Sequence, residues 1–294
     1  MNAARAFDIG IIGERIDPGF RGTRALLDAG ELAGITALAA RQAQAGACAL
    51  NINVGARAMQ EPQFMAAVVR AAQAGAPLPL CFDYQGLEAQ RACLAAYEPE
   101  RAGGALPLVN YVTEPRWELV ELARQHACGV VVMLSERSEG GAAVGNRTAA
   151  EMHARAARGG AAHRRIRVGT RRHLPGRGRG RRRCRPRGPE PHDARGTGAA
   201  AGRSRSCRRA PLGALSNIGQ QLPPKAADGS DLRLALESAF LTLAVPLGLD
   251  RVIGTPWRPY ARLADDNHVL RTYREFIAAE GSAATRLVRR FYRA

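Results

Sequence analysis

Polar side chains gather where short apolar runs of this sequence end. They are carboxylic acids, amides and hydroxyls with a few arginines, and no histidine is among them. Amides and carboxylates place hydrogen-bond donors and acceptors side by side, which suits recognition of the edge of a flat heterocycle. In chain order, the set is Glu14, Arg15, Asp17, Asn51, Asn53, Asp83, Asn110, Ser135, Glu136, Ser216, Asn217, Gln220, Thr255, Trp257 and Arg258.

Other kinds of site find little support in the sequence. No group of His, Asp and Glu has metal-ligand spacing, and no Ser or Cys has an evident paired base, so we expect no metal bound to this chain. The six cysteines form no CxxC pair, which is typical of reduced thiols in a cytoplasmic protein. Because the sequence has neither an apolar run of about 18 residues nor a signal-peptide pattern, we expect no membrane association.

The elements that must position the polar set alternate between strand and helix. Apolar strands are predicted at 9–15, 47–55, 77–83, 106–111, 128–134, 211–219 and 249–254. Helices are predicted at 31–46, 61–75, 86–97, 114–127, 148–157, 231–248, 264–280 and 282–292. Continuous apolar strands between helices indicate a parallel sheet covered on both faces, and therefore an α/β protein.

The spacing of the strands favours a (β/α)8 TIM barrel formed by a single domain over residues 1–294. Most strands begin 22 to 38 residues after the previous one, but 83 residues separate the starts at 128 and 211, which leaves room for a sixth unit. In such a barrel the strand ends that carry the polar set meet at one mouth. The alternative, a doubly wound sheet, needs a Gly-rich phosphate turn after the first strand, and GIIGERIDPG lacks GxGxxG.

An Arg-rich segment at 158–210 occupies the place of the sixth strand and helix. It holds 18 Arg and two acids, and therefore most of the formal net charge of +17. Its only large apolar residues are Ile166, Val168 and Leu174, too few for a strand and an amphipathic helix. It is either a real disordered basic loop or, as we favour, a frame-shifted stretch, because 42 Arg against a single Lys indicate GC-rich coding DNA. Nucleic-acid binding by this segment is the weaker interpretation.

Five motifs follow one another along the chain: IIGERIDPGF, ALNINVGARA, PLCFDY, PLVNY and LSNIGQQLP. In this order they resemble the pterin-binding methyltetrahydrofolate:corrinoid (cobalamin) methyltransferases of the dihydropteroate synthase-like superfamily. The resemblance covers residues 9–157 and 211–294, and it implies a TIM barrel that forms a homodimer. The sequence departs from the family twice. Asp17 stands where the family has Asn, and the pterin-binding Asp that ends strand 6 in the family is absent from the readable sequence.

The resemblance also assigns roles to members of the polar set. It implies that Asp83 and Asn110 hold the edge of the pterin ring, and that Asn217 lies beside N5, the nitrogen that carries the methyl group. The other residues expected in the pocket are Asn51, Asn53, Ser216, Glu14 and Arg15. For the last two, an ion pair at the barrel floor is the alternative.

The function implied is transfer of the N5-methyl group of methyltetrahydrofolate to the Co(I) centre of a corrinoid carried by a partner protein. N5 leaves only if it gains a proton or a strong hydrogen bond, and the amide of Asn217 can donate such a hydrogen bond. A dihydropteroate synthase is the competing enzyme, but it needs basic residues for its pyrophosphate, and Lys225 is the only lysine. Two further hypotheses are a basic binding protein that acts through 158–210 and an inactive frame-shifted product.

Overall fold

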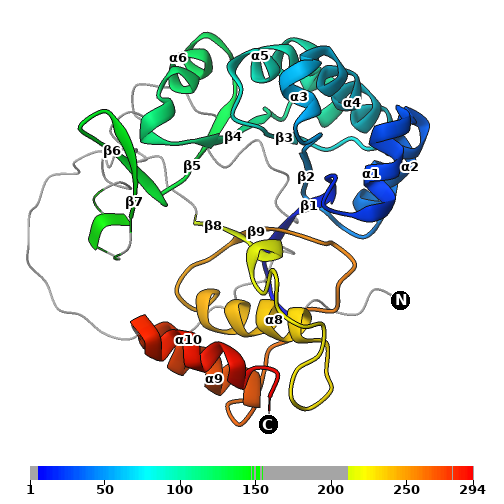
Figure 1. Ribbon diagram of the computed structural model, residues 1–294. Helices are drawn as coiled ribbons and strands as arrows, with labels where there is room; N and C mark the ends of the chain where they lie inside the picture. The colour runs from blue at the N-terminus through cyan, green and yellow to red at the C-terminus, as the bar shows by residue number, and fades with distance from the viewer. Residues whose placement is uncertain are drawn as a thin grey trace, which may run out of the picture.

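Seven parallel strands form a single curved sheet at the centre of the molecule (Figure 1). The computed structural model describes residues 6–146, 148, 150–152, 154, 211–279 and 281–293. Within them the sheet order is β5-β4-β3-β2-β1-β9-β8, and each neighbouring pair is parallel. The strands are β1 (Gly10–Ile16), β2 (Ala49–Ile52), β3 (Leu80–Asp83), β4 (Leu108–Val112), β5 (Gly129–Val132), β8 (Leu212–Ala214) and β9 (Arg251–Gly254).

The sheet is a nearly closed, barrel-like structure surrounded by helices, which confirms the predicted TIM-like α/β architecture at this level. The first strand pairs with the last one, as a barrel requires. The two edge strands are β5 and β8, which are the strands that flank the predicted sixth unit. The Arg-rich segment 158–210 lies outside the described residues.

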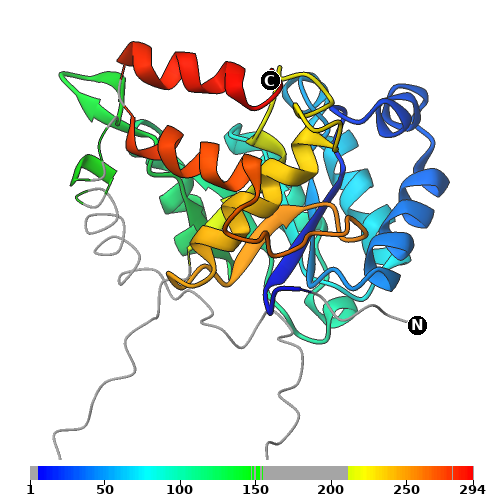
Figure 2. The ribbon, with the colours of Figure 1, turned by 90° about the horizontal axis from the view of Figure 1, so that it is seen from below.

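Helices cover the outer face of the sheet. Those between β1 and β5 are α1 (Arg21–Ala29), α2 (Leu32–Gln44), α3 (Arg57–Gln60), α4 (Pro62–Gly75), α5 (Leu87–Ala96), η1 (Pro99–Ala102), η2 (Glu114–Arg116) and α6 (Glu118–Gln125). The helices that follow β8 in the chain are η3 (Leu215–Asn217), α8 (Leu232–Ala244), α9 (His268–Ala278) and α10 (Gly281–Arg290). Helices α2, α4 and α5 pack side by side, whereas α9 packs on α8 and α10 on α9, so that these two extend outward from the barrel (Figure 2).

Two apolar layers lie on the two faces of the sheet. The outer layer, between strands and helices, contains the fully buried side chains of Leu50, Ile52, Leu80 and Phe82. The inner layer fills the barrel and consists of Ile12, Ala49, Cys81 and Ile253, with Leu108, Val131, Leu212 and Ala214 packed against them. Because side chains alternate along a strand, the residue two positions after each inner apolar residue returns to the interior, nearer the mouth.

Several elements of the structure were not predicted from the sequence, including the short helices α3 and η1. Helix α1 was not predicted, since its only apolar run is Ala25–Leu27; it ends at Gly30 in the left-handed conformation (φ 69°), where glycine carries no steric penalty. After β5, the strands β6 (Glu136–Glu139) and β7 (Ala142–Gly145) form an antiparallel hairpin. Its turn is Gly140–Gly141, both at positive φ, and this Gly-Gly pair is the signal that indicates a hairpin.

The predicted strands are shorter than their apolar runs, and the predicted helix at 148–157 is described only in part, at 150–152 and 154. Among the described helices, none combines the length and apolar character needed to cross a membrane.

Candidate functional site

Three asparagines and one aspartate lie together where β2, β3 and β4 end; we call Asn51, Asn53, Asp83 and Asn110 the amide–carboxylate cluster. Nδ2 of Asn51 donates a hydrogen bond of 2.9 Å to Oδ2 of Asp83. The Asn53 side chain also hydrogen-bonds this carboxylate. Nδ2 of Asn110 is 3.5 Å from Oδ1 of Asn51, and both residues are buried. The structure therefore brings together four of the residues that the sequence singled out.

Strand register places the side chains of Asn51, Asp83 and Asn110 on the inner face of the sheet. Asn51 pairs with Cys81, and Asp83 pairs with Asn110. Each of these polar residues follows an inner apolar residue by two positions, as Asn51 follows Ala49 and Asp83 follows Cys81. Polar groups consequently line the carboxyl end of the barrel directly above its apolar filling.

The loop after β2 holds Asn53 in place. The backbone N–H of Gly55 donates to Oδ1 of Asn53 across 2.7 Å, which leaves the amide nitrogen of Asn53 to face Asp83. Gly55 has a positive φ of 62°, a conformation that glycine adopts without steric cost. The NVG sequence thus builds a turn whose side chain supports the cluster.

The charge on Asp83 is set by opposing effects. Burial raises the pKa of its carboxyl, and nearby Asp17 raises it further, whereas the hydrogen bonds from Asn51 and Asn53 lower it. Burial also raises the pKa of Asp17, against the backbone N–H of Gly19 and the charge of Arg24. Two carboxyl groups therefore lie near each other at this part of the mouth, and the net effect on each is to raise its pKa.

Glu14 connects the other side of the barrel mouth. Its residue is only 6% exposed, and Oε1 accepts a hydrogen bond of 3.0 Å from Oγ1 of Thr255. Ser216 also hydrogen-bonds its side chain; burial raises the Glu14 pKa while both hydroxyls lower it. Glu14 thus links β1 to Ser216, which follows β8, and to Thr255, which follows β9.

Asn217 is the exposed last residue of η3, beside the buried Leu215. Its Oδ1 accepts a hydrogen bond of 3.1 Å from Nε2 of Gln220. With the oxygen occupied, the amide nitrogen of Asn217 is presented as the donor. Within the described residues no hydrogen bond links Asn217 to the amide–carboxylate cluster.

The remaining predicted residues lie apart from the cluster. The guanidinium of Arg15 lies over the ring of Phe20 at 3.6 Å and 5.6 Å from the ring of Trp257; in the described part of the chain it forms no salt bridge with Glu14. Arg258 forms a salt bridge with Glu237, with 3.1 Å between Nε and Oε2. Glu136 lies in the β6–β7 hairpin, 3.6 Å from Arg116.

Sequence reasoning missed Glu237 on α8. It is only 4% exposed, and burial raises its pKa to about 7 although Arg258 lowers it. The negative charges of Glu14 and Asp231 also raise the pKa of Glu237. Glu237 therefore interacts electrostatically with Glu14 at the barrel mouth. A single acid within the apolar run LALESAFLTLA was the available signal, because a charged residue on a buried helix face needs a partner.

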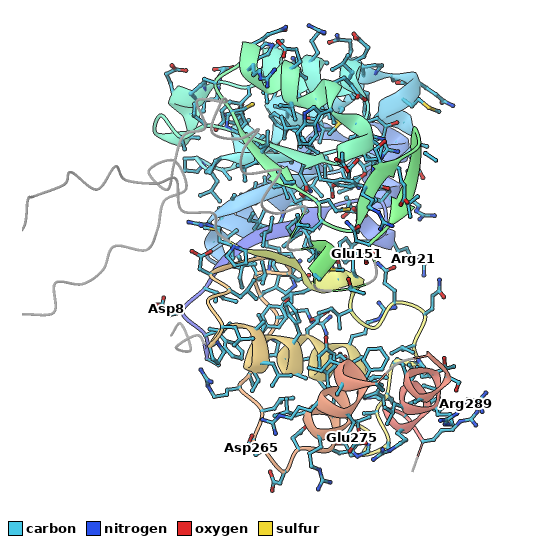
Figure 3. The ribbon with its side chains drawn as sticks, turned by 90° about the vertical axis from the view of Figure 1, so that its left-hand side faces the viewer. Asp8, Arg21, Glu151, Asp265, Glu275 and Arg289 are labelled. Carbon is cyan, nitrogen blue, oxygen red and sulfur yellow. The ribbon has the colours of Figure 1, made fainter. Side chains whose placement is uncertain are left out.

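Charged residues mark the two ends of the barrel. Asp8 precedes β1 and lies at one end, while Arg21, which follows β1, lies toward the other with Glu151 (Figure 3). In the part of the chain that the structure describes, no group of three or more His, Cys, Asp and Glu side chains could hold a metal ion.

No protein-family model matches this chain, and a search of curated proteins returned no match.

Proposed function

We propose that this chain binds methyltetrahydrofolate through its pterin ring and transfers the N5-methyl group to a corrinoid on a partner protein. The observation that carries the proposal is the amide–carboxylate cluster at the ends of three adjacent strands. The five motifs that resemble the pterin-binding methyltransferases supply these same residues.

The donors and acceptors of the cluster suit the edge of a pterin. A carboxylate has about four acceptor sites, and Asp83 uses two of them for Asn51 and Asn53. The other sites are available to the N–H groups of the pterin edge. Because Asn110 directs its amide nitrogen toward Asn51, its carbonyl oxygen adds a further acceptor.

Asn217 provides the hydrogen bond that the leaving nitrogen needs. When the methyl group passes to the Co(I) nucleophile, which would supply the electron pair of the new bond, the carbon–nitrogen bond breaks. Its electron pair stays on N5, and N5 takes up a proton from solvent water. A donor whose hydrogen bond strengthens as this charge develops lowers the barrier without helping the ground state. The contact from Gln220 orients the Asn217 amide for this role.

The methyl acceptor is a second substrate. A corrinoid protein supplies a Co(I) nucleophile when it docks at the mouth, and the resemblance further implies that the methyltransferase is a homodimer. The residues of this chain bind the donor, orient it and hydrogen-bond N5.

Calorimetric titration with methyltetrahydrofolate tests the binding step. We expect Asp83→Asn to weaken binding by about tenfold to a hundredfold, since a hydrogen bond to a charged group contributes about 1.5–3 kcal/mol. The matched control is Asp8→Asn, the same exchange at the opposite end of the barrel. The proposal is wrong if the folded wild-type chain shows no binding at millimolar donor, or if both variants lose affinity equally.

Methyl transfer is measured separately, with free cob(I)alamin as the acceptor and its absorbance as the signal. We expect Asn217→Ala to bind the donor normally but to transfer the methyl group about a hundredfold more slowly, the order of magnitude for loss of one oriented donor. Equal loss of binding and transfer would assign Asn217 to binding instead.

A further inference from the structure

Two arginines and two aromatic rings form a stack beside β1; we call Arg15, Phe20, Arg41 and Trp257 the arginine–aromatic stack. The Arg15 guanidinium lies 3.6 Å from the Phe20 ring centroid and 5.6 Å from that of Trp257. The guanidinium of Arg41, which comes from α2, lies 4.2 Å from the same Trp257 ring. Two cations are thus collected around one indole.

Neither cation of the stack is neutralised within the described residues. No salt bridge or side-chain hydrogen bond is formed by the guanidinium of Arg15 or Arg41 in this part of the chain, and Nε of Arg15 is buried without a hydrogen-bond partner. Burial lowers the pKa of Arg15, and Arg41 and Arg258 lower it further, while Glu14 opposes them. Arg258 has its own carboxylates, Glu237 and Asp231.

A second donor without a partner lies next to the first. Gln42 is fully buried and uses Oε1 to accept a hydrogen bond of 2.9 Å from the backbone N–H of Arg15, but its Nε2 has no partner among the described residues. Buried polar groups normally find partners. Unsatisfied donors and unneutralised cations in one place indicate a site for an anionic acceptor.

The stack adjoins the mouth of the barrel. Arg15 is the residue after Glu14, and Trp257 follows Thr255 by two positions, while Glu14 and Thr255 are hydrogen-bonded to each other inside the mouth. A ligand held at the mouth can therefore extend one end to the stack. Flat aromatic faces beside guanidinium forks suit an aryl group that carries a carboxylate.

We propose that the arginine–aromatic stack binds the p-aminobenzoyl-glutamate tail of the methyl donor through its carboxylates. This inference rests on the proposed function, because it assigns a second contact to the same substrate. The charge of Arg41, which is exposed, and the guanidinium of Arg15, which is held against Phe20, recognise the anionic end.

The test compares four probes by calorimetry: methyltetrahydrofolate, a tail-less methyltetrahydropterin, p-aminobenzoyl-glutamate alone, and inorganic phosphate. Arg41→Gln is the main variant, because Arg41 is exposed and its loss spares the fold. Arg15→Lys is the second, since it keeps the charge but loses the planar fork. Arg21→Gln is the matched control, an exposed arginine outside the stack at the same end of the barrel.

We expect Arg41→Gln to weaken methyltetrahydrofolate and the isolated tail by about fivefold, the size of one partly exposed ion pair, and to leave the tail-less pterin unchanged. Arg21→Gln should change none of them. Equal effects on the pterin with and without its tail would overturn the inference, and so would binding of phosphate but not of the tail. If the tail binds in an Arg41-dependent manner but the tail-less pterin never binds, the carboxylate site stands and the proposed function fails.

Discussion

The amide of Asn51 holds the carboxylate of Asp83 across neighbouring strands, with 2.9 Å between Nδ2 and Oδ2. The two residues are separated by 32 positions in the chain, yet the parallel pairing of β2 with β3 places their side chains on the same inner face. The orientation of the carboxylate is therefore fixed by the barrel itself before any ligand arrives. Such preorganisation reduces the entropy that binding must otherwise spend on ordering side chains.

Removing the Asn51 amide tests this coupling. Because the hydrogen bond from Asn51 lowers the pKa of Asp83, we expect Asn51→Ala to raise that pKa further and to reduce the free energy of unfolding by about 1–3 kcal/mol. Urea unfolding of both single variants and of Asn51→Ala with Asp83→Ala forms a double-mutant cycle. A coupling energy of about 1 kcal/mol is expected, and additive effects would show that the two side chains do not interact.

Gln220 should matter through Asn217. Under the proposed function, we expect Gln220→Leu to free the Asn217 amide and to lower kcat for methyl transfer several-fold. KM for methyltetrahydrofolate should stay nearly unchanged, because the proposed ground-state binding does not need this contact. The readout is initial-rate kinetics with cob(I)alamin. Gln63→Leu, on the exposed face of α4, makes the same chemical change elsewhere and should leave both constants unaltered. A rise in KM alone would assign Gln220 to binding.

The strands and the amide–carboxylate cluster could be predicted from the sequence because both follow from local rules. Each strand that lies between the two edge strands repeats one pattern on its inner face. An apolar residue is followed two positions later by a polar one, as in Ala49 and Asn51 or Cys81 and Asp83. Parallel strands bring their carboxyl ends to the same mouth, so strand order alone was enough to predict that these polar residues would meet.

Other features depend on contacts that no local pattern encodes. The register of β1 shifts after Gly13, and Arg15 contacts Phe20 and Trp257. A strict alternation of side chains between the two faces of β1 could not predict these contacts of Arg15. The pairing of Glu237 with Arg258 joins a helix to a loop 21 positions later, and only tertiary structure could reveal it.

Glu237 should make stability depend on pH. Its pKa is raised to about 7 by burial, from an ordinary 4.5, so the native state holds this proton more tightly than the unfolded state. Its contribution is fully present below pH 4.5 and is lost as the pH rises to about 7, by about 3 kcal/mol in total. Urea unfolding of wild type and Glu237→Gln across this range should show the stability difference moving in favour of the variant as the pH rises.

Arg258→Gln is a second variant for the same experiment. Because Arg258 lowers the Glu237 pKa, Arg258→Gln should move the upper end of the pH-dependent range above 7. A stability difference between wild type and Glu237→Gln that stays constant from pH 4.5 to 8 would contradict a titrating Glu237. So would an Arg258→Gln profile that ends below the wild-type range.

Close contact between α2 and α4 should make Gly75 intolerant of a side chain. A Cβ at Gly75 would overlap the backbone carbonyl oxygen of Thr36, in a region where Oγ1 of Thr36 also donates to the carbonyl of Ala71 across 3.0 Å. Because backbone cannot yield as a side chain can, we expect Gly75→Ala to lower the free energy of unfolding by about 1–3 kcal/mol.

Gly22→Ala is the matched control, since Gly22 lies in α1 and a Cβ there meets nothing within 4 Å. Alanine has the higher helix propensity, so this variant should be neutral or more stable by up to about 1 kcal/mol. Chemical denaturation of both variants measures the difference, and opposite signs are expected from the same substitution. If Gly75→Ala is as stable as Gly22→Ala, the backbones of α2 and α4 do not approach each other closely at Gly75, and the prediction is wrong.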